Sequence, residues 1–122
     1  MKIKEIGYVT IRVKDLEEAG KVFADLFEME FTSHGENPQL DIRNLMSPFI
    51  ELITPLTPDG PVAKTLEKSG EGVALVSFKV ANIEEEVAEM ESKGIRQIWR
   101  REKRALFHPR DLFGVMVELA ES

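Results

Sequence analysis

Two glutamates, Glu51 and Glu118, are the residues of this chain best placed to carry out acid–base chemistry. Each lies among apolar neighbours in a segment typical of a β-strand, Phe49–Ile53 and Gly114–Leu119, where strand propensity disfavours Glu. A carboxylate in such a place is costly unless it is paired, solvated or used. If the two lie close together, we expect them to titrate as a coupled pair, a useful property for proton transfer. The alternative is that both simply face solvent on an open sheet.

These glutamates are 67 positions apart, and the same spacing relates three pairs of segments. I11-R-V-K-D-L-E-E matches F78-K-V-A-N-I-E-E, F49-I-E-L-I matches M116-V-E-L-A, and L40-D-I-R matches F107-H-P-R. In the first pair, Asp15 and Asn82 are suited to cap a helix, and Glu18 and Glu85 three residues later complete a capping box in each half. The spacing therefore predicts two copies of one module, as internal repeats indicate.

Each half reads as a strand, a helix and three further strands. In the first half, alternation and helical spacing predict a helix over Leu16–Phe27 and strands over Ile6–Val13, Glu30–Ser33, Gln39–Leu45 and Phe49–Ile53. The second half predicts a helix over Ile83–Ser92 and strands over Val73–Val80, Ile95–Arg100, Lys103–Phe107 and Gly114–Leu119. Pro61 and Gly70 favour a short linking helix, Pro61–Lys68.

The predicted fold class is α+β, with two tandem βαβββ modules that form a curved mixed sheet with a concave pocket. The whole chain, 1–122, is expected to be one domain, with modules at about 1–56 and 71–122 and the linker at about 57–70. The helices are expected to cover one face of each sheet, which leaves the other face to line the pocket.

The mixed face of the strands, together with the hairpin and strand ends, supplies the candidate ligand-binding residues. They are Tyr8, Thr10, Arg12, Asp41, Arg43, Leu75, Ser77, Lys79, His108 and Met116. The 67-residue spacing makes Tyr8 the mate of Leu75, and Asp41 the mate of His108. His108 is predicted to be a general acid or a ligand donor, or else a structural residue at a strand end. His34 is expected to lie exposed in a loop.

Composition narrows the classes of partner. The net charge of -6 disfavours binding to nucleic acid, no apolar run is long enough for a membrane span, and the absence of Cys excludes disulfides and fits a cytoplasmic protein. One basic segment runs against this balance. Its residues are Arg96, Arg100, Arg101, Lys103 and Arg104. They are either solvated charges that protect an edge strand or a landing site for a phosphorylated ligand such as coenzyme A.

Several motifs resemble the vicinal oxygen chelate (glyoxalase, bleomycin resistance, dioxygenase) superfamily, and most of all its methylmalonyl-CoA epimerases. They are K14-D-L-E-E-A, I50-E-L-I-T-P-L, P61-V-A-K-T-L, G70-E-G-V-A-L-V-S-F-K-V, F107-H-P-R and G114-V-M-V-E-L. The resemblance implies the glyoxalase-like fold, a homodimer, and proton abstraction beside a thioester carbonyl. It also implies a divalent metal held by a His on each first strand and by Gln or Glu on the fourth strands.

The implied metal-ligand positions are Tyr8, Glu51, Leu75 and Glu118, so both imidazoles are missing. Leu75 has no ligand atom, and carboxylates alone hold a divalent ion weakly. We therefore expect no cofactor, although a divalent metal stays possible. Without a metal, Arg12 and Lys79 are candidates to stabilise developing negative charge.

Three hypotheses remain. The first is a metal-free protein that binds a small organic ligand, for example an acyl-CoA, in its concave pocket. The alternative is an isomerase or lyase acting on an acyl-CoA or related carbonyl compound, with Glu51 and Glu118 as the catalytic pair. The third is a structural or regulatory dimer with a vestigial pocket. Exposed sheet edges give a physical reason to expect a homodimer.

Overall fold

The computed structural model describes all residues, Met1–Ser122, and the chain forms two compact units. The middle unit is Thr10–Ala74, and the terminal unit combines Met1–Val9 with Leu75–Ser122. The boundary falls inside two strands, β1 (Glu5–Arg12) and β5 (Gly72–Val80), so these units divide the chain differently from the two modules of the repeat. No helix is both long enough and apolar enough to cross a membrane.

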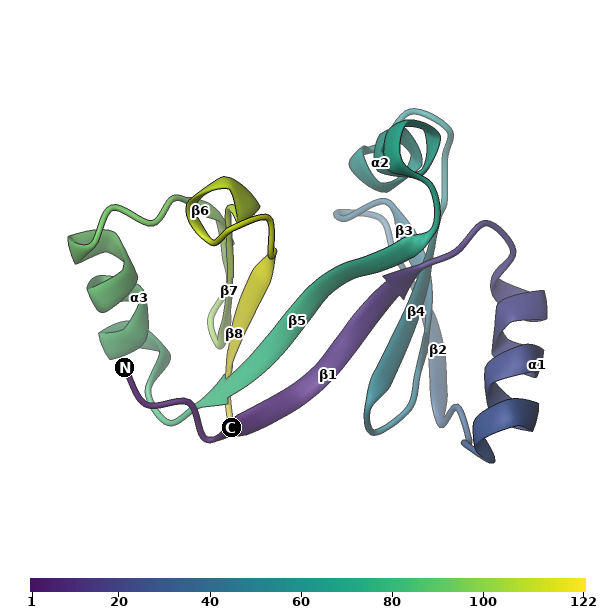
Figure 1. Cartoon of the computed structure of the whole chain (residues 1–122), viewed down its shortest axis with the longest axis horizontal. Coiled ribbons are helices and arrows are strands. Elements are labelled where there is room, and N and C mark those ends of the chain that lie inside the picture. Colours follow the sequence, from purple (N-terminus) through teal and green to yellow (C-terminus); the bar gives the residue numbers. More distant parts are fainter. The chain divides into compact units, whose positions relative to one another are not determined.

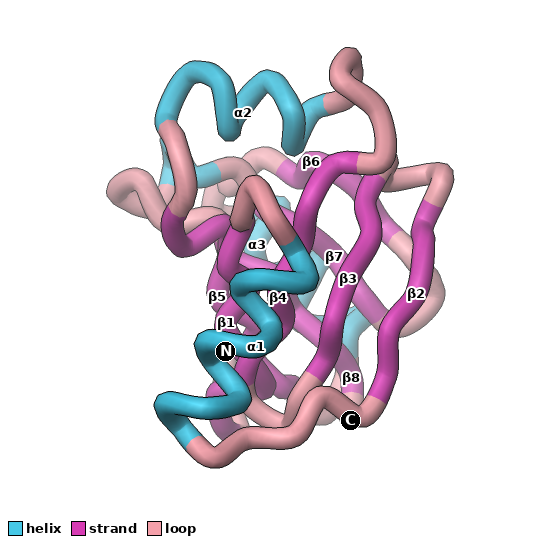
Figure 2. The backbone as a smooth tube through the Cα atoms, turned by 90° about the vertical axis from the view of Figure 1, so that its right-hand side faces the viewer, coloured by secondary structure: helices cyan, strands magenta, loops and turns pink.

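The middle unit packs helix α1 (Leu16–Phe27) against a sheet with the strand order β2-β3-β4-β1 (Figure 2). Its other strands are β2 (Ser33–Asn37), β3 (Ile42–Met46) and β4 (Ile50–Pro55), which form antiparallel pairs. Helix α2 (Pro61–Ser69) follows, with Pro61 in its first turn and Gly70 as its C-cap. The linking helix is therefore confirmed.

The terminal unit packs helix α3 (Ile83–Ser92) against a sheet with the order β1-β5-β8-β7-β6 (Figure 1). Strands β6 (Gln97–Arg100), β7 (Arg104–Phe107) and β8 (Val117–Glu121) form antiparallel neighbours, whereas β5 and β8 are parallel. A short 3-10 helix, η1 (Pro109–Asp111), lies between β7 and β8. The mixed α+β class with tandem βαβββ modules is confirmed.

The caps explain why both long helices start where the sequence predicts. Asp15 accepts a hydrogen bond from Glu18 N, and Asn82 accepts one from Glu85 N, which satisfies a backbone donor that the helix itself cannot. Each helix buries an apolar stripe. Leu16 is buried with Val13 and Leu52 in the middle unit, and Ile83 is buried in the corresponding core of the terminal unit.

Two predictions about the strands were wrong. Strand β2 covers Ser33–Asn37 rather than Glu30–Ser33, because Phe31 packs on the core as part of a loop and the true strand is polar. The spacing of 67 also fails for the third strand of each module. Met46 pairs with Glu51 and Leu106 with Glu118, so β3 and β7 correspond at a spacing of 60. The difference arises because Leu106 and Glu118 are seven residues further apart in the chain than Met46 and Glu51, and η1 lies in this longer stretch.

Candidate functional site

The correction to the third strand removes one predicted pair, Asp41 with His108. Asp41 lies in the turn before β3, with a positive φ of 56°, where its carboxylate accepts a 2.6 Å hydrogen bond from Thr57 Oγ1. His108 follows β7 and caps η1, because its Nδ1 accepts a hydrogen bond from the backbone N–H of Arg110. Both side chains hold turns together in different units, which favours the structural reading of His108.

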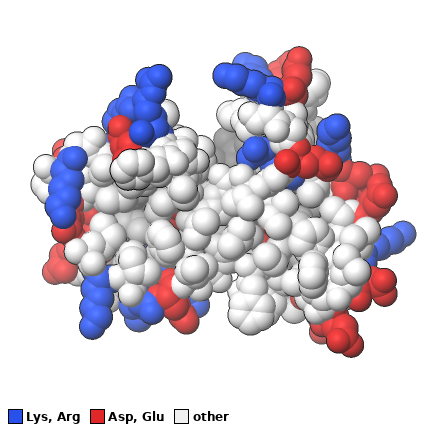
Figure 3. Space-filling model, viewed as in Figure 1, with Lys and Arg blue, Asp and Glu red and all other residues white.

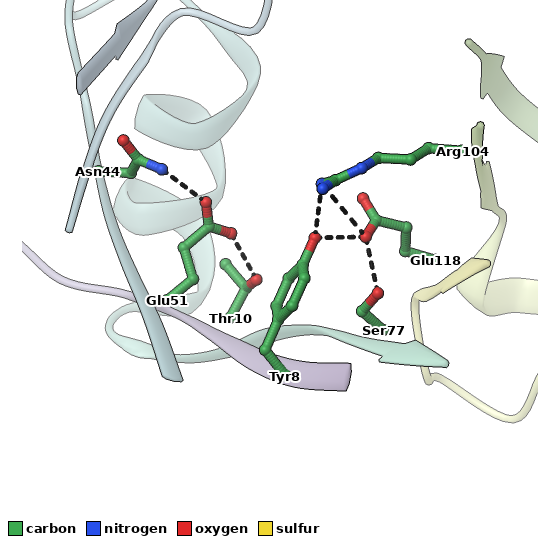
Figure 4. A network of polar contacts seen from close by, with 7 residues as sticks. All are labelled: Tyr8, Thr10, Asn44, Glu51, Ser77, Arg104 and Glu118. Carbon is green, nitrogen blue, oxygen red and sulfur yellow. Dashed lines mark hydrogen bonds and ion pairs between the residues drawn. The ribbon is translucent and has the colours of Figure 1, made fainter. Parts of the chain in front are cut away.

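In the terminal unit, three polar side chains meet around the carboxylate of Glu118 (Figure 4). Tyr8 Oη and Ser77 Oγ both donate to Glu118 Oε1, the latter over 2.7 Å. Arg104 Nη1 donates to Tyr8 Oη over 2.9 Å and lies 3.8 Å from Glu118 Oε1. Tyr8 and Ser77 come from adjacent strands, β1 and β5, and Glu118 and Arg104 from β8 and β7.

This cluster, Tyr8–Ser77–Arg104–Glu118, is buried at one end and open at the other. Glu118 is 4 % exposed and Ser77 is fully buried, whereas the Arg104 side chain is 50 % exposed. A buried carboxylate needs polar partners, and here two hydroxyls and a nearby guanidinium supply them at Oε1. The exposed half of Arg104 leaves a cation at the surface of this cluster.

The middle unit holds a related but simpler arrangement around Glu51 (Figure 4). Thr10 Oγ1 donates to Glu51 Oε1 over 2.7 Å, and Asn44 Nδ2 donates to Glu51 Oε2 over 2.9 Å. Thr10 is the repeat mate of Ser77, and each donates to a glutamate 41 residues further along the chain. The hydroxyl–carboxylate pair is therefore a duplicated feature of the two modules.

The other predicted site residues of the middle unit are engaged in structural contacts. Arg12 donates to the backbone carbonyls of Gly70 and Val73, which ties β1 to the segment after α2. Arg43 pairs with Glu17 at 3.0 Å.

In the terminal unit, Lys79 pairs with Glu5 at 3.3 Å, and Leu75 is half-buried on β5. Met116 precedes β8, where its carbonyl accepts a hydrogen bond from Val76 N. A cavity elsewhere in this unit is lined by Val87, Glu91, Ile95, Gln97 and Phe107.

Sequence reasoning missed the roles of Arg104 and Asn44. They occupy equivalent positions, because Arg104 pairs with Ala120 and Asn44 with Ile53, each two residues beyond the glutamate on the neighbouring strand. The basic segment did contain Arg104, but only the hairpin register shows that it reaches Glu118. Two other members of that segment form ion pairs, Arg96 with Asp111 and Arg100 with Glu84.

The donor atoms around Glu118 do not fit a divalent metal. Leu75 has no ligand atom, the Tyr8 hydroxyl donates its proton to Glu118, and Glu118 Oε1 already accepts two hydrogen bonds. No three His, Cys, Asp or Glu side chains are gathered where they could hold an ion. The remaining oxygen, Glu118 Oε2, accepts no hydrogen bond, but a single carboxylate oxygen with no imidazole beside it holds a divalent ion poorly, and an ion there would meet the Arg104 cation.

The charged side chains on the face drawn in Figure 3 are spread rather than gathered into one basic patch. On the face drawn in Figure 3, charged side chains of both signs lie over α1 and α2 of the middle unit, while the surface over β1 is largely uncharged. Such a distribution favours recognition of a small ligand by a few positioned side chains over binding of a long polyanion.

The paired βαβββ modules define a glyoxalase-like fold. A family model described as "Glyoxalase/Bleomycin resistance protein/Dioxygenase superfamily" matches residues 8–112, and the chain belongs to this superfamily. It is 30 % identical to human mitochondrial methylmalonyl-CoA epimerase, covering 96 % of this chain and 73 % of the human protein.

Two solved structures support the fold. The methylmalonyl-CoA epimerase of Mycobacterium tuberculosis superimposes with a TM-score of 0.90 at 26 % identity, covering 98 % of this chain and 88 % of that one. A Streptomyces coelicolor methylmalonyl-CoA epimerase in complex with 2-nitronate-propionyl-CoA gives a TM-score of 0.91 at 25 % identity, with 99 % of each chain covered. The resemblance read from the motifs is thus confirmed.

Proposed function

We propose that this chain binds a small organic carbonyl compound of the acyl-CoA class, at the strand face that carries Tyr8, Ser77 and Glu118. The observation that carries the proposal is the buried Glu118, surrounded by donors on a strand whose neighbours Val117 and Leu119 belong to the core. Burial of a charged cluster costs more free energy than burial of apolar side chains in the same place. A role in ligand binding accounts for the presence of the cluster. The acyl-CoA complex of a similar epimerase supports the ligand class.

Binding is expected without a divalent metal, because Glu118 Oε1 and the hydroxyls of Tyr8 and Ser77 are engaged with one another and Leu75 offers no ligand atom. Titration calorimetry with a panel of acyl-CoA esters, in buffer containing EDTA and then in buffer containing Mg²⁺, tests both statements. Saturable binding with the same affinity in both buffers supports the proposal. Absence of binding across the panel overturns it, and binding that requires Mg²⁺ overturns the metal-free part.

The second candidate is an isomerase that exchanges the proton next to the thioester carbonyl. The observation that favours it is the retention of a hydrogen-bonded glutamate in each module, Glu51 and Glu118, in a chain similar to named epimerases. Incubation of acyl-CoA esters in D₂O, followed by mass spectrometry, detects exchange at the α carbon. Loss of exchange in Glu51→Gln or in Glu118→Gln identifies the catalytic base. Binding without exchange contradicts the isomerase and supports ligand binding only.

We also infer a homodimer. Strands β2 and β6 end the strand orders of their units and offer unpaired backbone groups. Analytical ultracentrifugation across a range of concentrations tests this, and a monomer at all concentrations contradicts it.

A further inference from the structure

Arg104 is held in place on one side and open on the other. Its Nη1 donates to Tyr8 Oη over 2.9 Å and lies 3.8 Å from Glu118 Oε1, and its Cζ lies 6.0 Å from the centre of the Tyr8 ring. These contacts fix the guanidinium through one nitrogen. A side chain that is already immobilised loses less entropy when it binds a ligand.

The opposite edge of the Arg104 guanidinium, Nε with Nη2, has no protein acceptor, and the side chain is 50 % exposed. A guanidinium carries five N–H donors in a planar fork that matches the two oxygens of a carboxylate. Arg96 shows this match within the same chain, because its Nε and Nη2 donate to the two oxygens of Asp111 over 2.9 and 3.0 Å. In Arg104 the same edge is left open.

We propose that Arg104 binds a carboxylate of the ligand through Nε and Nη2, with Tyr8 and Glu118 as the residues that position it. The ligand class is therefore an acyl-CoA ester or small acid that bears a carboxylate close to its carbonyl group. This inference rests on the function proposed above and adds the group that is recognised. The Arg104 guanidinium is a fixed cation beside the Tyr8 and Glu118 oxygens that a metal would otherwise use. Recognition of the ligand carboxylate therefore needs no metal.

The nearby Glu118 does not prevent an anion from binding. Its Oε1 accepts hydrogen bonds from both Tyr8 and Ser77, and it lies on the Nη1 side of the guanidinium rather than at the open edge. Neutralisation of Glu118 should therefore strengthen carboxylate binding modestly, whereas removal of the Arg104 charge should abolish the preference for it.

Malonyl-CoA and propionyl-CoA test the inference, because they differ mainly by a carboxylate in place of a methyl group. Calorimetry in EDTA is expected to give the wild type a preference for malonyl-CoA of about tenfold or more, as a charge-assisted bidentate contact provides. Arg104→Gln is expected to bring the ratio close to one, because malonyl-CoA loses the contact that propionyl-CoA never makes. Arg104→Lys, which keeps the charge without the fork, should retain part of the preference.

Lys103→Gln is the matched control, since it removes the same charge from the neighbouring exposed residue. Its preference for malonyl-CoA should equal that of the wild type. Because each ratio is measured within one variant, a partial loss of folded protein does not alter it, and Arg104→Lys gives the answer if Arg104→Gln fails to fold. Equal losses in Arg104→Gln and Lys103→Gln, or a wild type that binds both esters equally, overturn the role of Arg104 while the proposed function stands. A wild type that binds neither ester overturns both.

Discussion

The hydrogen bond from Ser77 to Glu118 should be one of the most valuable polar contacts in the terminal unit. Ser77 is fully buried, Glu118 is 4 % exposed, and the bond is 2.7 Å long. Hydrogen bonds to charged groups contribute about 1.5–3 kcal/mol, and water has little access here to replace the lost donor. We therefore expect Ser77→Ala to lower the free energy of unfolding by about 2 kcal/mol.

Urea unfolding followed by circular dichroism measures this loss. With a denaturant slope of about 1.5 kcal/mol/M, a loss of about 2 kcal/mol moves the midpoint down by roughly 1.3 M. In a Glu118→Gln background the same substitution breaks a bond to a neutral amide, which contributes only about 0.5–1.5 kcal/mol. The double-mutant cycle should then give a coupling of about 1 kcal/mol. The same loss in both backgrounds would refute the claim that charge strengthens this bond.

Thr10→Val is the matched comparison in the middle unit, because it removes the mate of the Ser77 hydroxyl and keeps the side-chain volume. Glu51 is half-buried and keeps Asn44 as a second donor, so the expected loss is smaller, about 0.5–1.5 kcal/mol. A loss as large as that of Ser77→Ala would show that burial of the carboxylate does not set the strength of the contact.

Three further substitutions test the packing and the ion pairs. Leu52→Ala, at a residue with no exposed surface, should cost about 2–5 kcal/mol in urea unfolding, and a smaller loss would mean that the site collapses around the gap. A Cβ at Gly60 would lie 2.8 Å from Asp41 Cγ, so Gly60→Ala should destabilise the chain by about 1–3 kcal/mol, and by much less in an Asp41→Ala background. The side chain and backbone N–H of Arg96 donate to Asp111 and lower the pKa of that carboxyl. The stabilisation by this ion pair is therefore complete above the ordinary Asp pKa, and it is lost as the pH falls from there through the lowered pKa of Asp111. The difference in free energy of unfolding between wild type and Asp111→Asn should be constant near neutral pH and should shrink in acid. A gap that does not change with pH would contradict the ion pair.

The parts of the fold that could be predicted are those specified by local chemistry. Both long helices have their predicted bounds, because Asp15 and Asn82 supply caps that any sequence scan can detect. Strand β2 was misplaced because S-H-G-E-N has no apolar alternation to mark it. Its place is set by pairing with β3, which is a tertiary constraint rather than a local one.

The candidate site was predictable only in part, for the same reason. Glu118 and Ser77 could be placed on one face, since strand alternation fixes which side each faces. Whether the repeat brings Glu51 near Glu118 stays a prediction. For Arg104 the sequence predicts only an edge charge or a contact to a phosphorylated ligand, because its place beside Glu118 depends on the register of β7 and β8. There the longer connection with η1 shifts the repeat spacing from 67 to 60.

Duplication gave both modules the same hydroxyl–carboxylate pair, and the third strand then made the two different. Glu51 meets the neutral amide of Asn44, whereas Glu118 lies beside the charged guanidinium of Arg104. An amide donates to a carboxylate without balancing its charge, while a guanidinium does both and keeps donors to spare. Of the two glutamates, Glu118 is therefore the one whose neighbour can also bind an anionic ligand. The double substitution Asn44→Arg with Arg104→Asn exchanges these donors and should remove the preference for a carboxylate from the terminal unit. If the protein keeps its preference after the exchange, other residues recognise the carboxylate.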